Sequence, residues 1–253
     1  MNYCSFSSSK IFLLGFFCAL CQCSSQRVIP DRRPPDRRAL QVAIARKCAV
    51  VVSSQKDLHP WLRKGFSREN APKDGQAGTA SPVTADGYLL TADHVIHQYK
   101  NRYIHVVYGT GSQLRIAQAR VVWRAPSSDL ALLHAPIATP FFYHFSSPDR
   151  PIAEGTSIFH GGLSTGLSPL YGSLNDTIPS QNFFSPPQRF RMDIPLVPGD
   201  SGGPILDNNA RLIGVNSSVE FLVPMETPIF TESHGVRPNV RHILKTIERD
   251  RRR

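Results

Sequence analysis

Residues 198–204 read Pro-Gly-Asp-Ser-Gly-Gly-Pro and place a single hydroxyl, that of Ser201, in a loop made mostly of glycine and proline. Glycine allows backbone conformations and close approaches that a side chain would block. Such a loop can present main-chain amides to a ligand, and two converging amides bind the oxyanion formed when a hydroxyl attacks a carbonyl. The loop therefore predicts a nucleophile at Ser201 and an oxyanion hole made by Gly199 and Ser201. Alone, it would also suit an ordinary glycine-rich hairpin.

A serine hydroxyl becomes a nucleophile when a base takes its proton and an acceptor holds that base in the right tautomer. Two other stretches supply these groups. His94 follows the apolar run Tyr88–Leu90, and Asp129 precedes the apolar run Leu130–Leu133. The sequence thus predicts a triad in the chain order His94, Asp129, Ser201, which separates it from the two other well-known chain orders of this geometry.

Three stretches carry a resemblance to a known family: Thr91-Ala92-Asp93-His94, Asp129-Leu130-Ala131-Leu132 and Gly199-Asp200-Ser201-Gly202-Gly203-Pro204. Together they resemble the trypsin-like serine proteases of the chymotrypsin fold. The sequence is also similar to the bacterial HtrA (Deg) branch in the further stretches 86–91, 193–198 and 212–216. The resemblance runs from about Gly78 to Asn216, most of the chain after the N-terminal leader predicted below.

The resemblance implies a fold and a reaction. The fold is all-β, with two six-stranded antiparallel β-barrels and the triad in the cleft between them. The reaction is hydrolysis of peptide bonds through an acyl-enzyme, in which His94 is general base and then general acid, Asp129 orients it and Ser201 attacks. The full HtrA proteins carry a C-terminal PDZ domain, and we expect none in residues 216–253, which are too few for one.

The resemblance also implies where a substrate binds. Val215, Asn216 and Ser217 would pair with an extended peptide as an added strand. Pro195 would form part of the pocket that reads the substrate side chain. Because proline offers no negative charge to a lysine or arginine, we expect a preference for small or apolar side chains.

The apolar pattern agrees with this fold class. Short apolar runs separated by turn residues are typical of antiparallel all-β proteins, and here they are 48–52, 87–91, 103–108, 120–123, 130–134, 156–159, 190–194, 212–216 and 221–223. Only the C-terminal stretch has a helical period, with Val240, Ile243, Leu244 and Ile247 on one face. We expect a first barrel at about 41–140, a second at about 150–235 and a helix at about 238–250.

The N-terminus predicts export. Lys10 precedes an apolar run at 11–20 and then small residues, which is typical of a signal peptide at residues 1–23. The run is shorter than the roughly 20 residues that span a bilayer. We therefore expect a secreted or periplasmic protein of the bacterial envelope. A lipid anchor at Cys23 is the less favoured alternative.

Arginine and proline dominate residues 24–40, which predicts a stiff linker before a protease domain at 41–253. Four of the five cysteines lie in the predicted leader, so Cys48 remains as a buried thiol without an internal disulfide partner. The net charge of +10 gathers in arginine clusters at 27–38 and 249–253, which favour weak association with anionic surfaces.

The expected partner is a protein or peptide substrate. The sequence has no aromatic platform or zinc-finger spacing for a nucleic acid, and no cofactor or metal site is expected. It does not indicate an oligomeric state. Two other functions remain open: a non-catalytic relative that captures extended peptides, and a structural envelope protein tethered by its basic arms, which charge alone supports.

Three positions depart from the family pattern or need explanation. Asp93 precedes His94 and could raise the pKa of the histidine or pair with a cation. Asp200 has no evident ammonium partner, because an Ile-Val-Gly-Gly type of mature start is missing. His160, which precedes two glycines, is the other histidine expected near the cleft.

Overall fold

The computed structural model describes residues 29–33, 36–64, 71–109, 113–147, 152–166, 168–178, 189–222 and 229–253. The predicted signal peptide at 1–23 lies outside these residues, as does part of the predicted linker. Within the described chain, no helix is both long and apolar enough to cross a bilayer.

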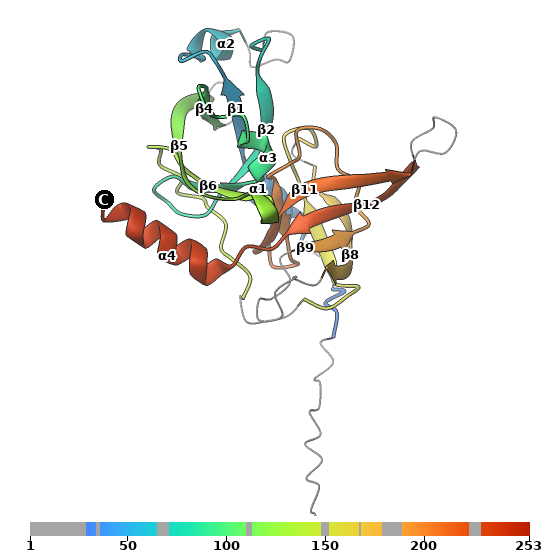
Figure 1. Cartoon of the computed structure of the whole chain (residues 1–253). Helices are drawn as coiled ribbons and strands as arrows, with labels where there is room; N and C mark the ends of the chain where they lie inside the picture. The colour runs from blue at the N-terminus through green and yellow to red at the C-terminus, as the bar shows by residue number, and fades with distance from the viewer. Residues whose placement is uncertain are drawn as a thin grey trace, which may run out of the picture.

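Two closed antiparallel barrels of six strands each form the body of the molecule, as predicted (Figure 1). The first has the strand order β1-β2-β3-β6-β5-β4 and consists of β1 (Cys48–Ser53), β2 (Gln76–Pro82), β3 (Tyr88–Thr91), β4 (Tyr103–Tyr108), β5 (Arg115–Ala125) and β6 (Leu130–His134). The second has the order β10-β11-β12-β9-β8-β7 and consists of β7 (Ser157–His160), β8 (Leu170–Ile178), β9 (Arg189–Met192), β10 (Pro204–Leu206), β11 (Leu212–Leu222) and β12 (Ile229–Val236).

The first barrel is built around β1, whose six residues are all buried. Its side chains alternate between two faces. Val50 and Val52 point into the barrel core, whereas Ala49 and Val51 pack outside it with Trp61 of the short helix α2 (His59–Arg63). This two-sided burial explains why the sequence of β1 is continuously apolar.

Strand β2 was not among the predicted strands, because it has no apolar run. Its central residues are small, and Thr79, Ala80 and Ser81 are completely buried. The main chain of β2 lies against the loop that carries Ser201, where Thr79 N donates to Ser201 O over 2.8 Å. This close approach requires small residues in β2. Because small residues do not form an apolar run, the sequence pattern did not predict the strand.

The predicted C-terminal helix is confirmed as α4 (Val240–Arg251), but it is not the only helix of the described chain. Helix α1 (Arg37–Ile44) begins inside the stretch interpreted as a linker. Asp36 caps it, and Leu40, Ala43 and Ile44 join the same buried cluster as residues of α4. This helix was not predicted because its three buried residues are few and lie among arginines, whose abundance indicated a linker.

Helix α4 lies beside the first barrel (Figure 1) and is held there by charges as well as apolar contacts. Asp250 accepts a hydrogen bond from Tyr88 Oη over 2.8 Å and a bidentate pair from Arg120. The hydrogen bond from Arg120 lowers the pKa of Asp250 below its ordinary value. The next residue of the helix, Arg251, donates two hydrogen bonds to the Asp86 carboxylate over 2.7 and 2.8 Å.

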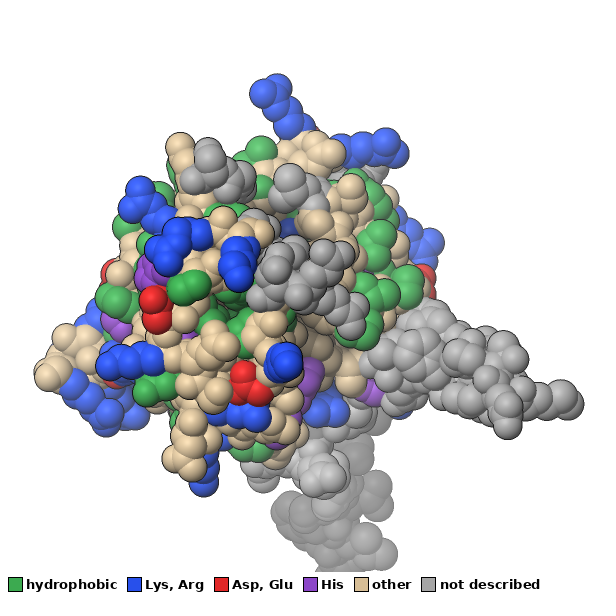
Figure 2. All heavy atoms as spheres, turned by 90° about the horizontal axis from the view of Figure 1, so that it is seen from above, with side chains coloured by type: hydrophobic (Ala, Val, Ile, Leu, Met, Phe, Trp, Pro, Cys, Tyr) green, Lys and Arg blue, Asp and Glu red, His purple; other side chains and the backbone are tan. Residues whose placement is uncertain are grey.

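Charge is otherwise distributed over the surface. Figure 2 shows lysine and arginine side chains spread across one face, with acidic side chains between them. Arg251, in the C-terminal basic cluster, is already paired with Asp86. The association of the basic tails with anionic surfaces stays a prediction.

We expect Asp250→Asn to lower the free energy of unfolding by about 1–3 kcal/mol, because Arg120 and Tyr88 lose a charged acceptor. Urea denaturation measures the change, and Glu248→Gln on the exposed side of the same helix is the matched control. Since the folded pKa of Asp250 lies below the unfolded one, the contribution is present at neutral pH and is lost as the pH falls through the folded value. Equal effects of the two substitutions would contradict this anchoring role.

Candidate active site

His94 and Asp129 meet because the strands that carry them are paired. His94 lies in α3 (Asp93–Ile96), which begins where β3 ends, and Asp129 immediately precedes β6 with a left-handed φ of 52°. Strands β3 and β6 pair with Thr91 opposite Ala131. His94 Nδ1 is therefore 2.9 Å from Asp129 Oδ2, and His94 N donates to Asp129 Oδ1 over 2.9 Å.

A third donor completes the surroundings of Asp129, because Ser217 Oγ of β11 donates to Asp129 Oδ2. Burial by itself raises the pKa of Asp129, but the hydrogen bonds from His94 and Ser217 outweigh burial and hold the pKa below its ordinary value. Asp129 is thus ionised at neutral pH. An ionised carboxylate facing Nδ1 keeps the proton of a neutral imidazole on that nitrogen and leaves Nε2 as the basic atom.

Asp93 does not face the histidine that follows it. Its side chain is buried, and Arg124 of β5 donates to both of its oxygens over 2.6 and 2.7 Å. The Arg124 guanidinium also lies over the Tyr99 ring, 5.1 Å from its centroid. Of the two roles considered for Asp93, the structure shows the pairing with a cation.

The loop that carries Ser201 is bonded to strands of both barrels. On β2 of the first barrel, Thr79 N donates a hydrogen bond to Ser201 O. On β11 of the second barrel, Gly202 N donates to Asn216 O over 2.8 Å and Asn216 N donates to Gly203 O over 2.9 Å. The nucleophile predicted from the sequence therefore lies where the two barrels meet.

The hydroxyl of Ser201 donates to the main-chain oxygen of Ser217 over 3.3 Å. Among the described residues, no hydrogen bond joins this hydroxyl to His94. The structure thus brings His94, Asp129 and Ser217 into one hydrogen-bonded group, with Ser201 linked to it through Ser217. Proton transfer from Ser201 to His94 requires the hydroxyl to leave the Ser217 carbonyl.

The amides of Gly199 and Ser201 donate no hydrogen bond to another described residue. Gly199 has a φ of 103°, a conformation that favours glycine. Its carbonyl oxygen accepts from Thr79 Oγ1 over 2.7 Å, so the loop is held from behind by a buried hydroxyl. Both amides remain available to bind an oxyanion.

Asp200 is completely buried and is satisfied by main-chain amides in place of an ammonium group. Ser164 N and Thr165 N donate to its Oδ1 over 3.1 and 3.2 Å, and Val197 N donates to its Oδ2 over 3.3 Å. The ammonium group of Lys47 interacts with Asp200 electrostatically. Burial lowers the pKa of Lys47 to about 8, and the negative charge of Asp200 opposes that shift.

The residues predicted to contact substrate lie in different environments. Pro195 is exposed, and its carbonyl oxygen is 3.2 Å from Nε2 of the fully buried His160. Val215 is paired with β10 on one side and β12 on the other, and both main-chain groups of Asn216 are bonded to the serine loop. Of the three strand residues, Ser217 alone directs a main-chain acceptor toward the Ser201 hydroxyl.

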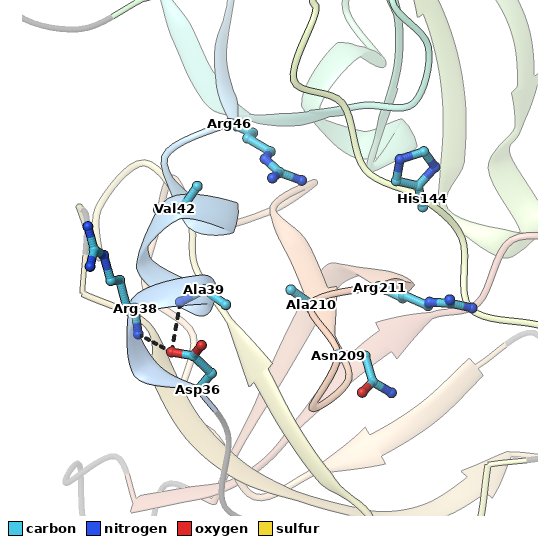
Figure 3. A pocket seen from close by; sticks show the side chains of 9 residues that line it. All are labelled: Asp36, Arg38, Ala39, Val42, Arg46, His144, Asn209, Ala210 and Arg211. Carbon is cyan, nitrogen blue, oxygen red and sulfur yellow. Dashed lines mark hydrogen bonds between the residues drawn. The ribbon is translucent and has the colours of Figure 1, made fainter.

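Away from these residues, a pocket of about 500 Å³ lies between α1 and the turn that joins β10 to β11 (Figure 3). The Arg46 side chain reaches into it, and His144 and Arg211 lie on its far side. None of the predicted triad residues lines this pocket. Without a nucleophile beside a base, it does not explain the motifs.

Comparison with known proteins agrees with this geometry. Residues 78–215, more than half of the chain, match the family described as trypsin-like peptidase domain. The chain belongs to this family. The matched segment of this trypsin-like peptidase domain begins in β2 and ends in β11, the two strands that hold the serine loop.

Curated relatives of the domain are HtrA- and DegP-like. The DegP-like probable periplasmic serine endoprotease of Marinomonas sp. is 25% identical over 169 residues, covering 64% of this chain and 34% of its own length. A protein of the same description from Pseudomonas fluorescens is 25% identical over 217 residues, covering 79% of this chain and 41% of its own. The chain thus spans well under half the length of these relatives.

Solved structures show the same fold. The HtrA-type protease AlgW with decapeptide superposes with a TM-score of 0.60 at 20% identity and covers 83% of this chain and 66% of its own. An inactive variant of Rv3671c from M. tuberculosis superposes with a TM-score of 0.56 at 18% identity and covers 87% and 96% of the two chains.

The packing of the trypsin-like domain around its serine loop predicts losses of stability of different size at two glycines with positive φ. At Gly202, a β-carbon would collide with Thr79 O and Thr91 Oγ1, whereas at Gly166 no atom lies within 4 Å of one. We expect Gly166→Ala to cost about 1–2 kcal/mol from its left-handed backbone alone. Gly202→Ala should cost clearly more. Urea denaturation of both variants tests this, and equal losses would rule out close packing at the serine loop.

Proposed function

We propose that this chain is an exported serine endopeptidase that hydrolyses peptide bonds through an acyl-enzyme on Ser201. The observation that carries the proposal is the ionised Asp129, which is bonded to His94 Nδ1 and to Ser217 Oγ, while the main-chain oxygen of Ser217 accepts from the Ser201 hydroxyl. His94 is half exposed, with 48% of its side chain accessible, so a substrate can approach its Nε2.

In the proposed reaction, the Ser201 hydroxyl leaves the Ser217 carbonyl and gives its proton to His94 Nε2 as its oxygen bonds to the substrate carbonyl carbon. The carbonyl oxygen takes the electron pair and accepts hydrogen bonds from the Gly199 and Ser201 amides. Asp129 stays ionised and stabilises the imidazolium.

The tetrahedral intermediate then collapses. The peptide C–N bond breaks, and the His94 imidazolium gives its proton to the departing amine. A water molecule attacks the remaining ester while His94 takes one of its protons. Release of the acid returns that proton to Ser201, so the enzyme ends the cycle as it began.

We propose that an extended peptide lies along β11 from Ser217 onward, because the main chains of Val215 and Asn216 are already bonded within the protein. The pairing would be that of an added strand. Pro195 would favour small or apolar side chains. One solved relative, AlgW, is described with a bound decapeptide, which supports a peptide substrate.

Export follows from the predicted signal peptide at 1–23, and relatives described as periplasmic support it. The protease domain would occupy 41–253, after a linker at 24–40. Cys48 is buried, and burial raises the pKa of its thiol to about 12. The thiol is therefore protonated at neutral pH and takes no part in the proposed chemistry.

A second candidate function is capture of extended peptides without cleavage. The observation that favours it is the hydrogen bond of the Ser201 hydroxyl to Ser217 O, which holds the hydroxyl away from the base. Both functions use the same cleft. They differ in whether Ser201 reacts.

A fluorophosphonate probe separates the two functions. We expect it to label the purified protein and not Ser201→Ala, because only an activated serine attacks the phosphorus centre. His94→Ala should lower the rate of peptide hydrolysis by about 10⁶-fold, and Asp129→Asn should lower it by about 10⁴-fold. His59→Ala, at an exposed position of α2, is the matched control and should label like the wild type. Peptide binding by a protein that never labels would establish the capture function instead.

A further inference from the structure

The direction of each oxyanion-hole amide is set by the carbonyl of its own peptide group. The Gly199 amide shares a peptide group with Pro198 O, and the Ser201 amide shares one with Asp200 O. The described chain has no cis peptide bonds. In a trans peptide the N–H and C=O bonds point in opposite directions. A donor that binds the carbonyl from behind therefore aims the amide at the substrate.

Both carbonyls have such a donor on a side chain. Asp200 O accepts from Asn216 Nδ2 over 3.2 Å, as well as from Gly203 N over 2.9 Å. Pro198 O accepts from Ser164 Oγ. Asn216 is completely buried, whereas Ser164 lies at the surface. Two side chains from different strands and loops thus hold the two peptide groups.

The orientation of the Asn216 amide is fixed by His160, which is also completely buried. His160 Nε2 faces the Pro195 carbonyl, so this nitrogen carries the proton. Burial lowers the pKa of His160 and keeps the imidazole neutral, which leaves Nδ1 as an acceptor. Asn216 therefore presents its NH₂ group, and not its oxygen, to His160 Nδ1 over 3.2 Å and to Asp200 O.

We propose that Asn216 and Ser164 are positioning residues of the oxyanion hole, and that His160 sets which end of the Asn216 amide faces the Asp200–Ser201 peptide group. This proposal rests on the proposed serine peptidase function. It gives Asn216 a place behind the oxyanion hole, in contrast to the substrate contact implied by the family resemblance. The substrate pairs with the main chain beyond it.

The test compares Asn216→Ala and Ser164→Ala with the wild type. Loss of a complete oxyanion-hole donor lowers kcat by about 10²–10³-fold in other enzymes, so a misaligned donor should lower kcat by about 10–100-fold. KM should stay within about twofold, because the ground-state carbonyl does not depend on the oxyanion contacts. Affinity for a peptide boronate, which forms a tetrahedral adduct with Ser201, should fall by the same factor as kcat/KM.

Controls separate positioning from general destabilisation. Ser164→Thr keeps the hydroxyl and should retain activity. His105→Gln alters a buried histidine of the first barrel, whose Nε2 faces Lys56 O, and should leave kcat unchanged. Ser164 is exposed, so its alanine variant is expected to fold even if Asn216→Ala does not.

The outcomes are distinguishable. Wild-type kcat and boronate affinity in both alanine variants would overturn the positioning role while leaving the peptidase function intact. An equal loss of kcat in His105→Gln would also overturn it. A wild-type protein that forms no adduct with boronate or fluorophosphonate would overturn the peptidase function, and the positioning role with it.

Discussion

The site depends on one set of main-chain hydrogen bonds, in which the serine loop is held between β2 of the first barrel and β11 of the second. Thr79 N binds Ser201 O on one side, and Gly202 and Gly203 exchange bonds with Asn216 on the other. Backbone can approach backbone this closely only where side chains are small or missing. The glycines after Ser201 and the small residues of β2 are two sides of the same requirement.

Three carboxylates lie buried around this junction, and each is satisfied in a different way. Asp93 pairs with Arg124, Asp200 accepts from main-chain amides, and Asp129 accepts from His94 and Ser217. A buried carboxylate without partners would be costly, so all three need donors. Only Asp129 has a titratable partner that is open to solvent. The other two stabilise the architecture, and the proposed chemistry involves only the carboxylate that faces a base and can stabilise its protonated form.

The sequence predicts what depends on residue type and order. The motifs around His94, Asp129 and Ser201 indicate the two-barrel family. The spacing of Val240, Ile243, Leu244 and Ile247 indicates the last helix, although Leu244 is exposed and was wrongly expected on its buried face. Strand β2 could not be found by hydrophobicity, because its packing selects small residues. The contacts of Thr79, Ser164 and His160 could not be predicted either. Each side chain bonds a carbonyl that is far away in the sequence, and such a contact does not constrain the residues on either side of it. The positioning role proposed for Asn216 follows only when the fold places its side chain beside Asp200.

The hydrogen bond between the Ser201 hydroxyl and Ser217 O is compatible with catalysis because its net free energy is small. A neutral hydrogen bond contributes about 1 kcal/mol net, so releasing the hydroxyl costs less than about tenfold in rate. In the proposed binding mode, an extended substrate donates its own amide to the same Ser217 carbonyl. That amide competes with the hydroxyl for the acceptor, and the displaced hydroxyl is then free to turn toward His94. Substrate binding would thereby remove the contact that holds Ser201 away from its base, so that the serine is activated where a peptide already lies in the cleft.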